Sequence, residues 1–265
     1  MEYTCSLKIG AEVSLVVCLI DDYTAKQTSD NNINVFLKET PKRPIRKPDG
    51  YFVFTELHEM TYNLCVRSDI FLDEDLQVTP SQIAGRMMYV TLKPRSSYPF
   101  PGRTTLIRTA VCDSEGTPVG DAGIKAAVLS EECASAKLVN QKTESGSLEI
   151  SLINVAGKIL VGDMFLLKEK GEEKMEYCTI AGICGETRQY RLEQPLQFEY
   201  RRGALLLPVM HTRSDTRGEA VVCFRNLRSK LCDVKMEFTC KDKVLTREAK
   251  LEEGKTTYLG TIKMP

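Results

Sequence analysis

Hydrophobic and polar residues alternate in short runs along almost the whole chain. Because successive side chains of a strand point to opposite faces of a sheet, such runs predict β-strands with one buried face. Apolar residues at helical spacing are not sustained over any window of about 12 residues. The one exception is residues 80–87, where Thr79 and Ser81 offer caps to a single helical turn. We therefore predict an all-β protein.

The alternating pattern occurs twice in the same order. Residues 49–57 and residues 217–227 each place a glycine in a turn, continue with alternating apolar residues and end on a polar break. Two strand-like runs precede each of these segments and one follows it. These flanking runs are 13–20, 34–37 and 62–67 in the first copy, and 105–111, 124–129 and 234–240 in the second. A repeat of this kind predicts small β-sandwich modules.

The first sandwich is predicted to span residues 1–95 and to be followed by a proline-rich joint at 96–103. Proline fixes φ and lacks a backbone donor, so prolines in and beside the joint force extended backbone. These prolines are Pro94, Pro99 and Pro101. A freely swinging linker would not need the rings of Tyr98 and Phe100. We therefore expect both rings to pack against a domain and to make the joint semi-rigid.

The second sandwich is predicted at residues 104–134 and 210–265, with an insert at 135–209. The strand that ends near Leu129 is separated from its matching turn at 216–218 by far more chain than in the first copy. Loop tips of a β-sandwich tolerate such insertions because the incoming and outgoing chains lie close together. Strand-like runs within the insert predict a small β-barrel. They are residues 148–155, 164–168, 175–183, 188–192 and 204–209.

Charge and hydropathy exclude several classes of partner. The 36 basic and 36 acidic residues cancel, so we expect no nucleic-acid partner and no attraction to an anionic membrane. The basic stretch at 42–47 lies among Pro41, Pro44 and Pro48, and we interpret it as a stiff solvated loop rather than a phosphate-binding patch. The longest apolar run, residues 15–20, is too short to span a bilayer.

Two features of the sequence indicate a cellular location. Residues 1–20 carry Glu2, Lys8 and Glu12 where a signal peptide would need an apolar core, so we expect no cleavable signal peptide. Most of the ten cysteines lie inside strand-like apolar runs, where cysteine acts as a small hydrophobic residue. We predict reduced thiols and a place in the cytoplasm or within an assembled particle.

Catalytic and metal-binding motifs are missing from the sequence. There is no G-x-S-x-G, P-loop, H-E-x-x-H or C-x-x-C motif. We interpret His58 and His211 as solvated loop residues rather than general bases. The acidic run at 73–75 lacks the oxygen spacing and the glycine of a calcium loop. We therefore predict no catalytic residue, no cofactor and no bound metal, and a protein that is not an enzyme.

Several turn motifs carry a resemblance to a known family. Residues 116–124 (GTPVGDAGI), 214–220 (SDTRGEA) and 224–227 (FRNL) resemble carboxypeptidase regulatory-like, or transthyretin-like, domains. Residues 49–57 match the last part of that pattern, although the first copy lacks its G-x-P-V turn. The resemblance implies two transthyretin-like or immunoglobulin-like β-sandwiches, the second interrupted by the barrel.

A separate resemblance concerns the joint. Residues 92–101, followed by such a sandwich domain, resemble segments in proteins of phage-tail-like contractile injection systems. This likeness implies a structural part of a large assembly, with other protein subunits as partners.

Two functions follow from this organisation. The first is a non-catalytic structural subunit whose domains dock on other proteins; the alternative is an adhesion or ligand-binding module for glycan or peptide. For docking, we single out a turn before the last barrel strand, because aromatic and arginine side chains dominate interface hot spots. The candidate contact residues are Phe198, Tyr200, Arg201 and Arg202. A partly buried turn with solvated arginines is the competing interpretation of the same residues.

Overall fold

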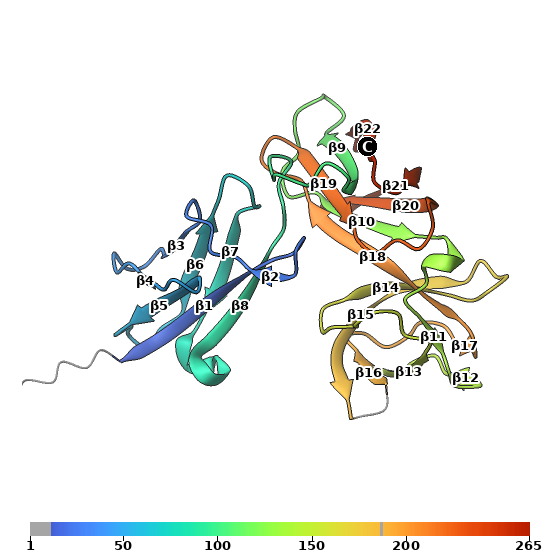
Figure 1. The fold of residues 1–265 in the computed structure, drawn as a ribbon, viewed down its shortest axis with the longest axis horizontal. Helices are drawn as coiled ribbons and strands as arrows, with labels where there is room; N and C mark the ends of the chain where they lie inside the picture. The colour runs from blue at the N-terminus through green and yellow to red at the C-terminus, as the bar shows by residue number, and fades with distance from the viewer. Residues whose placement is uncertain (1–11, 186–187) are drawn as a thin grey trace, which may run out of the picture. The chain divides into compact units, whose positions relative to one another are not determined.

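The structure is a computed structural model that describes residues 12–185 and 188–265. Within those residues it is built of β-strands, with short 3₁₀ turns and no α-helix (Figure 1). The chain divides into two compact units, Met1–Pro99 and Phe100–Pro265. The all-β fold class expected from the period-2 pattern is confirmed.

Unit 1 is a sandwich of two sheets. In the first sheet the order is β4 (Ile45–Arg46), β5 (Tyr51–Thr55), β1 (Val13–Asp21) and β8 (Met87–Leu92), with β2 (Lys26–Gln27) paired to the end of β1. The second sheet has the order β3 (Asn34–Leu37), β6 (Tyr62–Arg67) and β7 (Glu74–Val78). The final strand β8 runs parallel to β1, whereas the other neighbours are antiparallel.

The core of unit 1 follows directly from the alternation in sequence. Leu15, Val17 and Leu19 of β1 point inward together with Phe52 and Phe54 of β5, and all five are buried. Residues 80–87, the one helix-like stretch, form two single 3₁₀ turns, η1 (Pro80–Gln82) and η2 (Ala84–Arg86).

Each aromatic ring of the joint packs on its own unit. The hydroxyl of Tyr98 donates to Asp21 Oδ2 at 2.7 Å, and its ring meets the rings of Tyr23 and Phe71 edge to face. In unit 2, the guanidinium of Arg108 lies 5.8 Å from the centroid of the Phe100 ring. Both rings therefore pack against a domain, as expected from the sequence.

Unit 2 contains a second sandwich that repeats six strands of the first in the same order and has one further strand. One sheet is β19 (Glu219–Phe224), β9 (Thr105–Cys112) and β22 (Thr256–Lys263), with β22 parallel to β9. The other contains β18 (Leu205–Arg213), β10 (Gly123–Val128), β20 (Leu231–Cys240) and β21 (Lys243–Glu252). The central strands β1 and β9 thus have equivalent neighbours, so the sequence repeat corresponds to a repeat of topology.

The repeated glycine has the same structural role in both sandwiches. Gly50 and Gly218 have φ angles of +81° and +76°, a region that side chains rarely adopt. A Cβ atom on Gly50 would lie 2.9 Å from the carbonyl oxygen of Thr28, and one on Gly218 only 2.3 Å from that of Val111. Only glycine fits at either turn.

The insert of unit 2 is a closed barrel. Its ring of strands is β11 (Ala136–Leu138), β13 (Glu149–Ile153), β16 (Gln189–Leu192), β15 (Met175–Cys184), β14 (Met164–Lys168) and β18, which pairs again with β11. A short ribbon of β12 (Lys142–Thr143) and β17 (Tyr200–Arg201) accompanies it, and η3 (Glu131–Cys133) precedes it. A cluster of buried side chains that includes Leu138, Ile150 and Leu167 fills its interior.

Strand β18 belongs to the barrel and the sandwich at once. Its first half pairs with β14 and β11, and its second half, from Val209 to Arg213, pairs with β10. The insert boundary predicted at residue 209 therefore falls inside a continuous strand. The barrel is therefore continuous with a sandwich sheet and is not a separate domain connected by a loop.

Candidate docking surface

The turn that leads into the barrel ribbon is held by a carboxylate. Glu176 on β15 accepts hydrogen bonds from the backbone N–H groups of Gln197 at 2.8 Å and Phe198 at 3.1 Å. Residues 200 and 201 then pair with β12 in antiparallel register, so that Tyr200 lies opposite Thr143. The backbone of the predicted contact turn is thus fixed by β15 on one side and β12 on the other.

Tyr200 is not a surface contact residue, which corrects the sequence-based assignment. Its side chain is 0% exposed and belongs to the barrel core. Burial, followed by the nearby Glu176 carboxylate, raises the pKa of the Tyr200 hydroxyl far above its ordinary value. The ammonium of Lys174 lies 5.3 Å from the ring centroid. Because neighbouring residues of a strand face opposite sides, Tyr200 anchors β17 from inside the barrel while Arg201 points outward.

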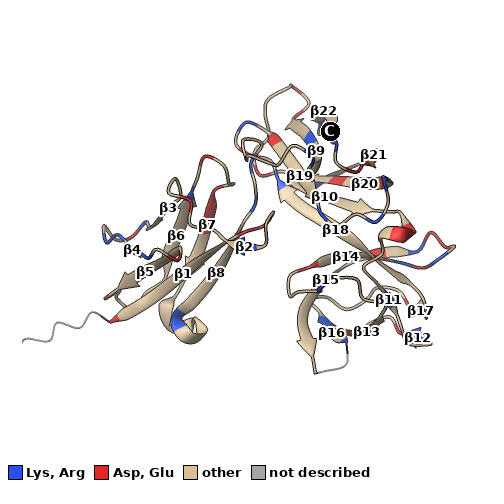
Figure 2. Ribbon diagram, in the orientation of Figure 1, with Lys and Arg blue, Asp and Glu red and all other residues tan. Residues whose placement is uncertain are grey.

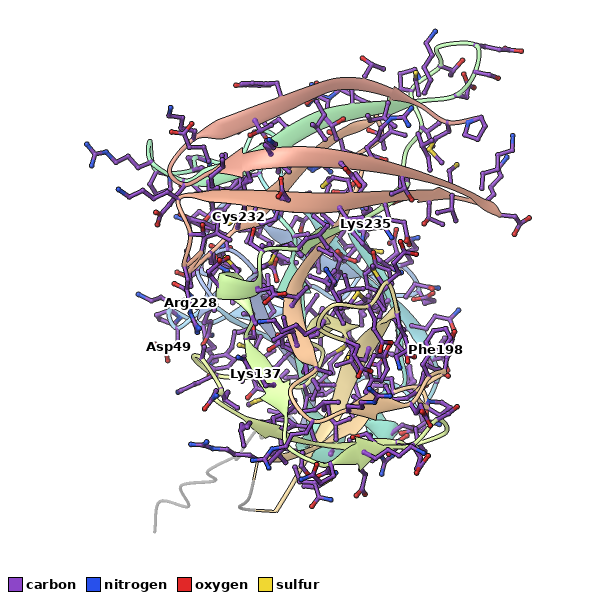
Figure 3. The ribbon with its side chains drawn as sticks, turned by 90° about the vertical axis from the view of Figure 1, so that its right-hand side faces the viewer. Asp49, Lys137, Phe198, Arg228, Cys232 and Lys235 are labelled. Atoms are coloured by element: carbon purple, nitrogen blue, oxygen red, sulfur yellow. The ribbon has the colours of Figure 1, made fainter. Side chains whose placement is uncertain are left out.

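The other three candidate residues remain on the surface. Phe198 is 44% exposed, the Arg201 side chain is 78% exposed, and Arg202 is exposed as well. Figure 3 shows Phe198 at the margin of the barrel, on the side away from Lys137. The structure therefore brings one aromatic ring and two guanidinium groups to the same exposed turn.

Ion pairs surround this turn. Lys142 bridges Glu199 at 2.9 Å and Glu144 at 3.0 Å, and these hydrogen bonds raise the pKa of its ammonium. Arg201 Nε lies 4.0 Å from the buried carboxylate of Glu169. The surface at this end of the barrel is strongly polar, with Phe198 as its exposed ring.

The barrel is fastened to the sandwich by apolar packing. Leu205 and Leu207 of β18 and Leu166 of β14 face away from the barrel interior and pack in one buried cluster with Ala127 of β10. Their neighbours Leu167 and Leu206 fill the barrel itself. Both faces of these two strands are therefore buried, which holds the barrel firmly on the sandwich.

A tyrosine adds a polar contact at the same junction. The ammonium of Lys125 on β10 lies 4.8 Å from the ring centroid of Tyr177 on β15, and it pairs with Glu237 on β20 at 3.6 Å. Burial, followed by the charge of Glu237, raises the pKa of Tyr177 to about 12. The three residues come from the barrel and from two sandwich strands, so they fix the barrel's orientation.

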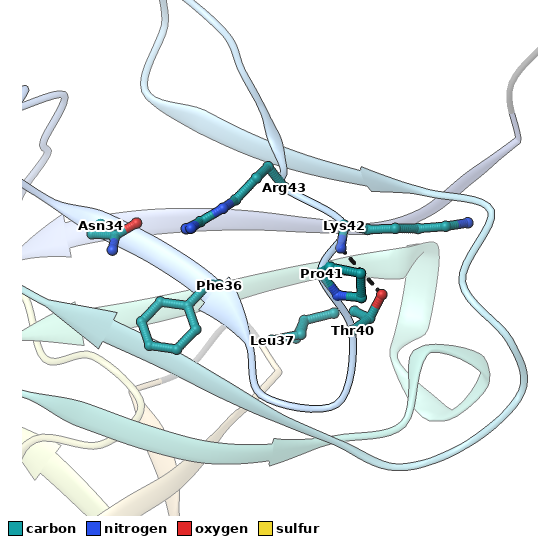
Figure 4. A pocket seen from close by; sticks show the side chains of 7 residues that line it. All are labelled: Asn34, Phe36, Leu37, Thr40, Pro41, Lys42 and Arg43. Atoms are coloured by element: carbon teal, nitrogen blue, oxygen red, sulfur yellow. Dashed lines mark hydrogen bonds between the residues drawn. The ribbon is translucent and has the colours of Figure 1, made fainter.

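Unit 1 carries a small open pocket beside the basic stretch (Figure 4). Its volume is about 280 Å³, and loop residues 40–43 fold back over Asn34 and Phe36 on the outer side of β3. The Arg43 side chain extends toward Asn34, whereas Lys42 extends away and donates to the carbonyl of Glu56. The basic stretch, interpreted from sequence as a solvated loop, thus contributes the Arg43 guanidinium to a pocket that Asn34 and Phe36 also line.

Groups with catalytic potential are dispersed over the described part of the chain. His58 and His211 are exposed and lie in different units. No group of three or more His, Cys, Asp or Glu side chains that suits a metal ion is found among residues 12–185 and 188–265. In Figure 2, basic and acidic residues are interspersed along the ribbon of each unit. Among the described residues, no helix is long and apolar enough to cross a membrane.

No family model matches the chain, and no curated protein matches it. Solved structures with some similarity include a streptococcal ancillary pilin, at 9% identity and a TM-score of 0.27, covering 94% of this chain and 68% of that one. The shaft pilin SpaA from Lactobacillus rhamnosus GG shows 10% identity and a TM-score of 0.24, covering 96% of this chain and 97% of that one. At such TM-scores the likeness carries no argument about function.

Proposed function

We propose that the protein is a non-catalytic structural subunit that docks on other proteins through its barrel. One observation carries this proposal: the six-strand sandwich of unit 1 occurs without a barrel, whereas in unit 2 a barrel is packed onto the corresponding sandwich. Unit 1 has counterparts of β9, β19, β22, β10, β20 and β21, but none of β18, the strand that the sandwich shares with the barrel. A module that is absent from the first sandwich, and is held on the second by buried leucines and by Tyr177, is suited to presenting a surface in a fixed direction.

The proposed contact surface consists of Phe198, Arg201 and Arg202. This segment offers an aromatic ring for apolar contact and two guanidinium groups for bidentate hydrogen bonds to carboxylates. The buried Tyr200 supports this surface from below, because it fixes the strand from which Arg201 projects. We propose other protein subunits, with acidic groups at the contact, as the partners.

Charge reversal tests this surface. We expect Arg201→Glu combined with Arg202→Glu to abolish recovery of the partner from the native host, while the circular dichroism spectrum stays unchanged. Lys241→Glu combined with Lys243→Glu is the matched control, because it reverses two exposed charges on the sandwich. Full partner recovery by the folded barrel variant would contradict the assignment.

A more specific proposal, a subunit of a phage-tail-like contractile assembly in the cytoplasm or within a particle, rests on the resemblance of residues 92–101. The free state of the nine described cysteines is compatible with a reducing compartment. Genes for sheath, tube and baseplate proteins beside this gene would support the proposal. Genes for surface anchoring or glycan use would favour the alternative function.

The alternative, a ligand-binding module, is favoured by the pocket in unit 1. Arg43 has no hydrogen bond or ion pair among the described residues, and it lies with Phe36 and Asn34 around the same open space. These groups suit an acidic peptide side chain. Titration with a glutamate-rich peptide at low salt tests this: binding that is lost in Arg43→Ala and kept in Lys47→Ala would support it, and no binding would exclude it.

A further inference from the structure

Two thiols meet where the chain leads into the barrel. Cys133, at the end of η3, and Cys232, on β20, have their Sγ atoms 3.5 Å apart. Both are free, and both are buried, with exposures of 6% and 1%. In sequence they are separated by 99 positions. Each thiol thus has as its neighbour a sulfur from a distant part of unit 2.

Hydrogen bonds hold the two segments that carry these thiols next to each other. Leu129 N–H donates to the carbonyl of Asp233 at 2.8 Å, and Asp233 N–H donates to Ser130 Oγ at 3.2 Å. On the other side, Arg228 Nη1 donates to the carbonyl of Ala134 at 3.4 Å. Figure 3 shows Arg228 and Cys232 on the same side of unit 2. Since the backbone is tied on both sides of the sulfur contact, the sulfurs need only a small approach to reach the bonded distance of about 2.05 Å.

We propose that Cys133 and Cys232 form a disulfide when the protein meets a peroxide. The sulfur of Cys133 attacks one oxygen of hydrogen peroxide and breaks the O–O bond; the product is a sulfenic acid, and the released hydroxide takes up the thiol proton as water. Cys232 sulfur then attacks the sulfenic sulfur, the S–O bond breaks, and the hydroxyl leaves with the Cys232 proton as a second water. Two thiols lose two electrons, and one peroxide gains them.

The order of the two steps follows from the environment of each thiol. Cys133 is the more exposed of the pair and therefore meets the oxidant first. Burial, followed by the neighbouring Cys133, raises the pKa of Cys232 to about 11, so that Cys232 stays protonated and reacts slowly with peroxide itself. Cys232 resolves the sulfenic acid because its sulfur is held 3.5 Å from that of Cys133, and its low thiolate fraction makes this second step slow as well.

The bond would close a loop that contains the entire barrel. Every strand of the ring that precedes β18 lies between residues 133 and 232, as does β18 itself. A force pulling on the two chain ends would pass from Cys133 to Cys232 through the disulfide and bypass the barrel. This consequence is independent of which partner the protein binds.

Peptide mapping of the unmutated full chain tests the site directly. After brief treatment with hydrogen peroxide and alkylation of the remaining thiols, we expect one dominant disulfide-linked peptide pair, joining Cys133 to Cys232. Cys133→Ser and Cys232→Ser should each abolish it. Cys65→Ser is the matched control, because Cys65 is also buried but its thiol lies beside the carbonyl of Asn63 and the carboxylate of Asp75 rather than beside another thiol. Sulfinic acid at both sites without a disulfide, or a mixture of other pairs, would overturn the proposal.

Single-molecule stretching from the chain ends tests the bypass. Complete unfolding of the oxidised protein should release a chain shorter by about 35 nm than that of the reduced protein, because the 99 positions between the thiols are withheld at about 3.5 Å each. Cys232→Ser should show the full length under both conditions. Equal lengths for the oxidised and reduced unmutated protein would refute the bypass.

Discussion

Replacing Gly218 by alanine should destabilise unit 2 by about 3–4 kcal/mol. A non-glycine residue in the left-handed region costs about 1–2 kcal/mol. The added Cβ would lie 2.3 Å from the carbonyl oxygen of Val111, so the backbone must shift. That shift disturbs two hydrogen bonds, from Val111 N–H to Gly218 O at 2.8 Å and from Val119 N–H to Val111 O at 3.0 Å, each worth about 1 kcal/mol.

Alanine substitutions at two other glycines distinguish the cost of the left-handed backbone from the cost of the close contact. Gly116 has a φ of +91° but nothing within 4 Å of the added Cβ, so Gly116→Ala should cost only about 1–2 kcal/mol. Gly50 is intermediate, since its Cβ would lie 2.9 Å from the carbonyl oxygen of Thr28. We expect the order of destabilisation to be Gly218, then Gly50, then Gly116.

Urea unfolding followed by circular dichroism measures these changes, and hydrogen exchange locates them. The Val111 amide donates to Gly218 and should lose protection in Gly218→Ala, while protection in unit 1 stays unchanged. If Gly218→Ala were no more destabilising than Gly116→Ala, the close approach of Gly218 to Val111 would be wrong.

Four further outcomes are expected. Deleting residues 137–208 and closing the gap with a short Gly/Ser loop should leave a soluble β-rich protein; an aggregated product would show that the sandwich depends on the barrel. Tyr98→Phe removes a hydrogen bond to buried Asp21 and should lower the stability of unit 1 by about 1.5–3 kcal/mol in urea titration, and no change would contradict that contact. Hydrogen bonds from Cys65 and then Arg67 lower the pKa of Asp75 to about 2, so its contribution to stability is present above the ordinary Asp pKa and is lost as pH falls toward about 2. Asp75→Asn should therefore reduce the loss of unfolding free energy between the ordinary Asp pKa and about pH 2. An unchanged pH dependence would show that Asp75 does not contribute to it. Thiol titration of the unfolded protein, prepared without reductant or peroxide, should recover close to ten thiols, and six or fewer would indicate disulfides.

The strands were predictable because their information is local. Inward residues such as Leu15, Val17 and Leu19 recur at every second position, and the turn glycines Gly50 and Gly218 mark the same place in both copies. These two signals suffice for an all-β fold and for the repeat. Neither depends on which strands pair.

The pairing of distant strands was not predictable. The closure of β11 on β18 and the sharing of β18 between barrel and sandwich join residues far apart in sequence. One signal was present in hindsight: Leu205, Leu206 and Leu207 form a continuous apolar run, which is typical of a strand buried on both faces. The contact between Cys133 and Cys232 has no local signal at all.

The error at Tyr200 has a simple physical cause. Composition favours the run from Phe198 to Arg202 as a contact turn, whereas the competing interpretation, a partly buried turn with solvated arginines, describes Tyr200 and Arg201 correctly. Successive side chains of a strand point to opposite faces, so Tyr200 points into the core while Arg201 points to solvent. The pocket at Arg43 was missed because a loop's fold over a neighbouring strand depends on tertiary packing.

Photo-crosslinking in the native host tests the central claim, docking through the barrel, most directly. A photoreactive residue placed at Phe198 samples the proposed surface, and one at Val244, an exposed apolar position on β21 with 57% exposure, serves as the matched control. We expect a discrete crosslinked protein from position 198 and none from position 244. A crosslink from position 244 alone, or none from position 198, would contradict docking through the barrel.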